Sequence, residues 1–234
     1  LAKSEREGAW REMAKQVAHE IKNPLTPMKL SIQHLQRAIK DNSPDIKELT
    51  ERISHRLIEQ IDTLSNIATA FSDFAKMPQG ELVKIEAAPI LVSTVELFNE
   101  LENLEIHIHH LVPDSFVKGD KEQLMRVFTN IIKNASQSIP EQQQGIIDID
   151  MLESEEDYVI SIKDNGIGIA EEKRSHIFEP NFTTKSSGTG LGLAISKNIV
   201  ERMGGKIWFE TEVGQYSIFY IRLPKWNELY NITI

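Results

Sequence analysis

The first third of the chain carries two long stripes of apolar residues with helical spacing, and no glycine interrupts them after Gly8. Spacings of three and four residues place each stripe on one face of a long helix. A turn signal at residues 41–45 separates the stripes, which predicts an antiparallel helical hairpin. Two helices cannot enclose both stripes, so a symmetric homodimer forming a four-helix bundle is expected. The stripes consist of Trp10, Met13, Val17, Ile21, Leu25, Met28, Ile32, Leu35 and Ile39, and of Ile46, Leu49, Ile53, Leu57, Ile61, Leu64, Ile67, Phe71 and Phe74.

The pattern changes after Met77-Pro78-Gln79-Gly80, which interrupts the helical periodicity. Short alternating segments and helical segments then follow one another, which predicts an α+β sandwich with a mostly antiparallel sheet. We expect strands at 106–111, 116–117, 146–152, 158–162, 206–209 and 217–223, and helices at 121–139 and 191–203. The expected organisation is a helical-hairpin domain at 1–77, a linker at 78–83, an α/β sandwich domain at 84–225 and a tail at 226–234.

Composition excludes several classes of protein as first hypotheses. The 234 residues carry a formal net charge of −9, which argues against duplex-DNA binding. Cysteine is absent, so thiolate metal sites and thiol nucleophiles are excluded. No apolar run reaches the roughly 18 residues of a membrane-spanning helix. Because the sequence begins with Leu1, we expect a fragment of a longer protein, whose membrane anchor can lie upstream.

A histidine on the first expected helix points away from the apolar stripe. His19 is followed one helical turn later by Asn23 on the same outward side. A neutral imidazole exposed on a rigid helix is a competent nucleophile toward phosphorus, and the neighbouring Glu20 can accept its other ring proton. Pro24 and Pro27 lie inside the helical pattern, so a bend is expected just after the histidine. On its own, this pair also fits an ordinary solvated surface histidine.

Two segments in the second part carry residue types suited to nucleotide binding. Asn130 and Asn134 share one helix face, and two amide oxygens suit a hard cation such as Mg²⁺. Asp164 follows an expected strand and offers a carboxylate to an exocyclic amine such as adenine N6. Gly166 and Gly168 then permit close backbone approach and positive φ. A polar helix face and a simple turn remain the alternatives for each segment alone.

Two further segments strengthen the nucleotide interpretation. Residues 178–185 read Phe-Glu-Pro-Asn-Phe-Thr-Thr-Lys, and residues 188–193 read Gly-Thr-Gly-Leu-Gly-Leu directly before an expected helix. Glycines that lead into a helix N-terminus present backbone N–H groups to an anion. No Gly-x-x-x-x-Gly-Lys-Ser/Thr occurs, so a Walker-type site is not supported. The four segments together predict an ATP site of another kind.

With these segments in this order, the chain resembles a two-component sensor histidine kinase over nearly its whole length. Residues 19–24 resemble the H-box, 130–135 the N-box, 164–168 the G1 box, 178–182 the F-box and 188–192 the G2 box. The stretch 18–27 is most similar to nitrogen-regulation sensor kinases of the NtrY type. The resemblance implies a Bergerat-type ATP-binding fold, a homodimer and a cytoplasmic position for this part of a protein anchored in the inner membrane.

The resemblance also implies roles for individual residues. His19 would take the γ-phosphoryl group of Mg-ATP and pass it to an aspartate of a response regulator receiver domain, with no nucleic acid involved. Glu20 would assist proton transfer, and Asn23 would align a water for dephosphorylating the regulator. Asn134 and Asn130 would bind Mg²⁺. The implied ATP-binding residues are Asn130, Asn134, Asp164, Gly166, Gly168, Phe182, Thr183, Thr184, Lys185, Gly188, Thr189, Gly190, Leu191, Gly192 and Ser217.

Three positions depart from the family's pattern. Gln137 stands where many members carry a phosphate-contacting lysine, and Asn181 replaces the usual aromatic residue. Tyr216 stands where a second glycine is common, which bears on the adenine contact expected near Ser217.

Two other functions compete with a histidine kinase. One is a Ser/Thr-directed kinase or gyrase-like ATPase of the same superfamily, and His19 in a complete H-box argues against it. The other is a degenerate scaffold that only dimerises and binds a regulator, and the presence of Asn134 and Asp164 argues against that.

Overall fold

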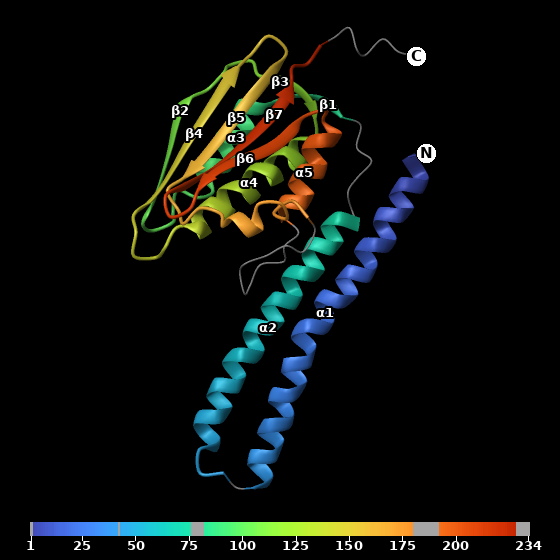
Figure 1. Cartoon of the computed structure of the whole chain (residues 1–234), viewed down its shortest axis with the longest axis vertical. Coiled ribbons are helices and arrows are strands. Elements are labelled where there is room, and N and C mark those ends of the chain that lie inside the picture. The colour runs from blue at the N-terminus through green and yellow to red at the C-terminus, as the bar shows by residue number, and fades with distance from the viewer. Residues whose placement is uncertain (1, 42, 76–81, 180–191, 228–234) are drawn as a thin grey trace. The chain divides into compact units, whose positions relative to one another are not determined.

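The structure is a computed structural model that describes residues 2–41, 43–75, 82–179 and 192–227. The chain divides into two compact units, a helical hairpin and an α/β unit (Figure 1). The hairpin consists of α1 (Ala2–Lys40) and α2 (Ile46–Ala75). The second unit consists of β1 (Val83–Glu86), α3 (Ala87–Glu96), β2 (Leu104–His110), β3 (Phe116–Gly119), α4 (Lys121–Ser138), β4 (Gly145–Glu153), β5 (Asp157–Asp164), the 3₁₀-helix η1 (Glu171–Lys173), α5 (Gly192–Arg202), β6 (Lys206–Glu212) and β7 (Tyr216–Pro224).

The hairpin confirms the two helices expected from the apolar stripes. The helix α1 continues without interruption through Pro24 and Pro27. Near the turn, α1 and α2 share a small buried cluster, because the stripe residues of the two helices face each other there. The cluster consists of Ala38, Leu49 and Ile53, with Leu35, Ile46 and Leu57 packed against it.

Several residues of the same stripes remain exposed in the hairpin. Leu25, Ile32, Ile39 and Ile61 each keep at least 44% of their surface accessible to solvent. Large aliphatic side chains gain about 1.5–3 kcal/mol each when they are fully buried. The hairpin by itself therefore leaves a substantial apolar surface in contact with water.

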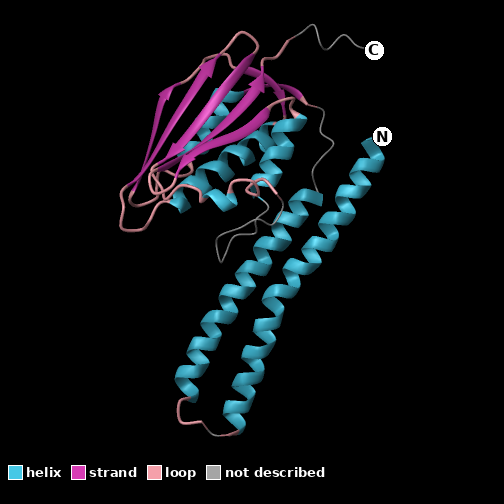
Figure 2. Ribbon diagram, viewed as in Figure 1, coloured by secondary structure: helices cyan, strands magenta, loops and turns pink. Residues whose placement is uncertain are grey.

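The second unit contains a five-stranded sheet in the order β2-β4-β5-β7-β6. Only the β2–β4 pair is parallel, and the other pairs are antiparallel. The helices of this unit lie on one face of the sheet (Figure 2). This arrangement confirms the expected α+β sandwich. Its core consists of Leu124, Phe128, Ile131, Ile132, Ile147, Ile149, Ile160, Ile162 and Ile221, each fully buried.

The helix α4 packs on the sheet and carries two residues of the predicted site. It begins after Asp120, whose side chain accepts a 3.0 Å hydrogen bond from the backbone N–H of Gln123 and so caps the helix N-terminus. One face of α4 packs against the sheet through its buried apolar residues. The other side carries Asn130 and Asn134, as the sequence predicts.

The structure adds elements that the sequence did not predict. Before the first predicted strand lie β1 and α3, and β1 pairs with β3 in a separate two-stranded sheet. Residues 78–81 of the expected linker lie outside the described residues, whereas Val83 already pairs with Gly119. At the other end, Trp226 donates its backbone N–H to Phe116 O at 2.7 Å. Hydrogen bonding of the α/β unit thus includes one residue of the expected linker, Val83, and one of the expected tail, Trp226.

Within the part of the chain that the structure describes, no helix combines the length and apolar character needed to cross a membrane.

Candidate functional site

A buried carboxylate lies at the end of β5. Asp164 is only 1% exposed, and its Oδ1 accepts hydrogen bonds from Ser138 Oγ at 2.8 Å and from the backbone N–H of Gly166 at 2.9 Å. A charged group is removed from water only where such donors compensate it. An ionised carboxylate can accept about four hydrogen bonds, so Asp164 can accept from a ligand donor as well.

The two glycines after Asp164 allow its loop to pack closely. A Cβ atom at Gly166 would lie 2.1 Å from Ser138 Oγ and 2.7 Å from Asp164 Oδ1. Gly168 has a φ of 69°, and a Cβ there would lie 2.4 Å from the carbonyl oxygen of Glu212. Both positions therefore require glycine, one for lack of space and the other also for its left-handed backbone.

The buried hydroxyl of Ser217 lies beside this carboxylate in the sheet. Ser217 is 2% exposed and is the register partner of Asp164 in the β5–β7 pair. Its Oγ lies 3.1 Å from Thr211 Oγ1, which also accepts a 2.9 Å hydrogen bond from the backbone N–H of Ile169. The loop after Asp164 is thus tied to β6 and β7 through two hydroxyl groups.

Asn165 holds the same loop to the start of β4. Its Oδ1 accepts from the backbone N–H of Ile146 at 2.9 Å, and its Nδ2 donates to the carbonyl of Gln144 at 2.9 Å. Both polar ends of this side chain are used in the protein. Asn165 therefore fixes the backbone next to Asp164.

The two asparagines of α4 differ in their surroundings. Asn130 donates from Nδ2 to Ser196 Oγ of α5 at 3.0 Å. A Cβ at Gly192, where α5 begins, would lie 2.1 Å from Asn130 Oδ1, so Gly192 lets the two helices approach. Asn134 is half-buried one turn later, and its side chain forms no hydrogen bond within the described part of the chain.

The structure does not describe all of the expected site. Phe182, Thr183, Thr184, Lys185, Gly188, Thr189, Gly190 and Leu191 lie outside the described residues, as does Asn181. His19 and Glu20 belong to α1, but their side chains are also outside the description. Asn23 is exposed on α1, in agreement with its predicted outward position.

Comparison with known proteins accounts for both units. Residues 9–80, and so His19, match the family model of the His Kinase A (phospho-acceptor) domain. Residues 119–227 match the histidine kinase-, DNA gyrase B- and HSP90-like ATPase model, which includes Asp164. The catalytic domain of histidine kinase ThkA is 31% identical, with a TM-score of 0.56, and the match covers 62% of this chain and 97% of that one. The chain belongs to the histidine kinases.

This histidine kinase core is also similar to curated full-length proteins. It is 35% identical to nitrogen regulation protein NtrY of Azorhizobium caulinodans, over 88% of this chain and 28% of that protein. It is 32% identical to sensor histidine kinase ZraS of Escherichia coli, over 91% of this chain and 45% of that protein. The chain thus spans between about a quarter and a half of the length of these relatives. The expected similarity to NtrY-type kinases is confirmed.

A second solved structure matches both units of the kinase. It is that of ThkA in complex with the response regulator protein TrrA, with a TM-score of 0.70 and 26% identity. The match covers 95% of this chain and 64% of that chain.

Three residues of the kinase's candidate site were not predicted from the sequence. Ser138 continues the polar face of α4 at the same four-residue spacing as Asn130 and Asn134, so the pattern could have revealed it. Thr211 and Ser196 bond to residues that are 42 and 66 positions away in the sequence, so no local pattern could have revealed them.

Proposed function

We propose that this core transfers the γ-phosphoryl group of ATP to His19 and then to an aspartate of a response regulator. The observation that carries the proposal is the presence of both matches in one chain, a phospho-acceptor domain containing His19 and an ATPase domain containing Asp164. The ATPase domain alone would support only nucleotide binding, and the phospho-acceptor domain alone would support only acceptance of a phosphoryl group.

Asp164 is the proposed acceptor for the exocyclic amine of adenine. Its donors Ser138 and Gly166 fix the carboxylate in one orientation within a buried setting. A buried acceptor rejects a ligand that presents another acceptor to it, because the two lone pairs repel and neither is solvated. The site should therefore prefer ATP to GTP, whose purine carries an oxo group at the corresponding position. Ser217 and the two glycines shape the same end of the site.

The chemistry of α4 fits a bound Mg²⁺, whose preferred ligands are oxygen atoms and water. Asn134 would provide the protein ligand, since its amide forms no hydrogen bond within the described residues. Asn130 uses its nitrogen toward Ser196, so only its oxygen remains suited to a cation. When bound, Mg²⁺ would neutralise charge on the phosphate groups. The phosphate end would be completed by residues 182–192.

The proposed reaction on α1 is an in-line displacement. An imidazole nitrogen of His19 forms the new N–P bond as the bond between the γ-phosphorus and the β,γ-bridging oxygen breaks. ADP leaves with the electron pair of the broken P–O bond. Glu20 accepts the proton from the imidazole. The exposed amide of Asn23, one turn away, is proposed to align water during regulator dephosphorylation.

The proposed partners are a second copy of this chain and a receiver domain. The exposed stripe residues Leu25, Ile32, Ile39 and Ile61 support a four-helix bundle, because a partner hairpin would cover them. The ThkA structure matched here contains a response regulator, which supports a similar partner. The proposed boundaries are 1–77 for the phospho-acceptor domain, 78–83 for the linker, 84–225 for the catalytic domain and 226–234 for the tail.

The test is His19→Gln in the full chain, assayed with radiolabelled ATP. We expect loss of phosphorylation with ATP affinity unchanged, because the acceptor and the nucleotide site lie in separate domains. The label in the wild type should be acid-labile and base-stable, as a phosphoramidate is. His34→Gln is the matched control, since His34 is an exposed histidine of the same helix.

Three results would contradict the proposal. Undiminished label in His19→Gln would remove His19 as the acceptor. Acid-stable label in the wild type would indicate a hydroxyl acceptor and so favour the Ser/Thr-directed alternative. ATP binding without any label in the wild type would favour the scaffold alternative.

A further inference from the structure

Three of the chain's seven histidines lie in the single strand β2. In β2, Ile106 and Ile108 are partly buried, whereas His107 and His109 are exposed on the opposite face. We call the side of the sheet away from the helices its open face. The alternation places the two exposed histidines on this open face, two residues apart.

The register of β2 against β4 brings carboxylates to the same face. His107 is the register partner of Asp148, and His110 is the partner of Asp150. The register shifts between Ile108 and His110, which marks a β-bulge. Without the extra residue, His110 would point to the face opposite to His107. The bulge turns it toward Asp150, and bulges commonly re-aim side chains in this way.

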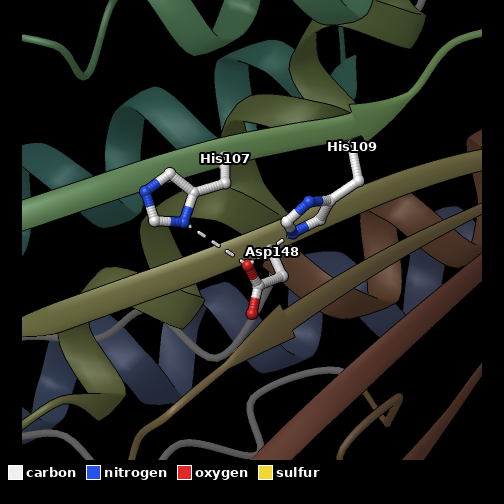
Figure 3. A group of neighbouring side chains, drawn as sticks. All are labelled: His107, His109 and Asp148. Carbon is white, nitrogen blue, oxygen red and sulfur yellow. Dashed lines mark hydrogen bonds and ion pairs between the residues drawn. The ribbon is translucent and has the colours of Figure 1, made fainter.

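The side chains converge most closely around Asp148 (Figure 3). Asp148 Oδ1 lies 2.7 Å from His109 Nε2 and 3.5 Å from His107 Nδ1. One ligand atom from each of the three residues lies within 4.8 Å of the other two. Metal–ligand distances of about 2.0–2.2 Å place ligand atoms on one ion roughly 3–4 Å apart, so small side-chain rotations suffice to bind an ion.

We propose that His107, His109 and Asp148 bind a divalent transition-metal ion such as Zn²⁺ or Ni²⁺. Two imidazoles and one carboxylate suit these ions, whereas Mg²⁺ prefers an all-oxygen shell. Glu105 Oε2 lies 3.4 Å from His107 Nε2, so it can hold that ring with Nδ1 facing Asp148. Three protein ligands leave further coordination positions open to water or to a partner's side chain.

This metal site is separate from the nucleotide site. Asp164 follows the buried residues Ile160 and Ile162 on the helix-covered face of the sheet. Asp148 alternates with the buried residues Ile147 and Ile149, so it belongs to the open face. The ion would thus be bound on the other side of the sheet, and its binding does not require ATP.

The test measures Zn²⁺ and Ni²⁺ binding to the full chain by competition with a chromophoric chelator, in the absence of nucleotide. We expect one ion per chain at micromolar concentration. The double variant His107→Ala/His109→Ala and the single variant Asp148→Asn should each weaken binding by at least about tenfold. A thermal shift on adding the metal should appear in the wild type and be absent from the double variant.

His55→Ala is the matched control. His55 Nε2 lies 3.5 Å from Glu59 Oε1, so this is also an exposed histidine–carboxylate pair, but without a second histidine. Its loss should leave metal affinity unchanged. Circular dichroism and ATP affinity should match the wild type in all variants, which separates loss of a ligand from loss of the fold.

Three outcomes would overturn the assignment. One is an absence of binding to the wild type at millimolar metal. Another is equal affinity in the wild type and the double histidine variant, which would place any ion elsewhere. The third is wild-type metal affinity in Asp148→Asn, which would show that the Asp148 carboxylate is not a metal ligand.

Discussion

Replacing Asp164 with alanine or asparagine tests two proposed roles of this residue, one in the stability of the catalytic domain and one in binding adenine. The carboxylate accepts from Ser138 Oγ and from the Gly166 backbone N–H. Ser138 can still donate to the Ala135 carbonyl at 2.8 Å, whereas the buried N–H of Gly166 loses Asp164 Oδ1 as its acceptor. One unsatisfied buried group costs about 1–3 kcal/mol.

The corresponding change in melting temperature follows from the size of the unit. At about 3 °C per kcal/mol for a domain of this size, Asp164→Ala should lower the Tm by roughly 3–9 °C. Asp164→Asn keeps an oxygen at the Oδ1 position, so its Tm should fall by less than about 3 °C. Scanning circular dichroism of the nucleotide-free chain provides both values.

Nucleotide affinity, unlike the Tm, should fall strongly in both variants. Both lose the proposed acceptor for the adenine amine, and in Asp164→Asn the new amide would present an N–H donor to another donor. Each variant should therefore bind ATP at least about tenfold more weakly, a loss of about 1.4 kcal/mol, measured by calorimetry. Wild-type ATP affinity in Asp164→Asn would refute the adenine role. An unchanged Tm in Asp164→Ala would refute the hydrogen-bonding argument.

Three further predictions concern other parts of the kinase. Asn23→Ala should reduce regulator dephosphorylation more than autophosphorylation, and equal losses in both rates would make the residue structural. Gly168→Ala should destabilise the catalytic domain by about 1–3 kcal/mol in urea unfolding, because a side chain is strained at φ 69° and meets the Glu212 carbonyl. A variant no less stable than wild type would contradict that reasoning. Ile61→Glu, at a 53%-exposed stripe position, should weaken dimerisation in sedimentation equilibrium, and an undiminished dimer would exclude this surface from the interface.

Periodicity in the sequence predicted the elements that have one apolar and one polar face. The helices α1, α2 and α4 and the hairpin of β4 and β5 belong to this class. The helix α3 was missed because its sequence, Ala-Ala-Pro-Ile-Leu-Val-Ser-Thr-Val-Glu, is apolar on most sides and contains a proline near its start. Such a short segment has no clear helical or strand periodicity.

The candidate site was only partly accessible from the sequence. The sequence predicted Asp164, Gly166 and Gly168 as site residues because a carboxylate and two glycines follow an expected strand. These residues are close together in the chain, so a local pattern contains them. The bond between Asn130 and Ser196 spans 66 residues, so no local pattern contains it. The bulge in β2 is likewise set by packing between strands. The histidines were therefore visible in the sequence, but their convergence on Asp148 was not.

The position of β2 at the edge of the sheet has a consequence for aggregation. An edge strand offers unpaired backbone groups to other chains, and bulges and charged side chains hinder such pairing. The imidazole and carboxylate groups of β2 thus keep this edge hydrated, and the bulge makes its backbone irregular. Valine at His107 and His109 would convert residues 106–109 into four consecutive β-branched residues, a composition typical of segments that assemble into intermolecular sheets. The histidines would then serve the kinase even when no metal is present, by keeping one chain from adding to the sheet of the next.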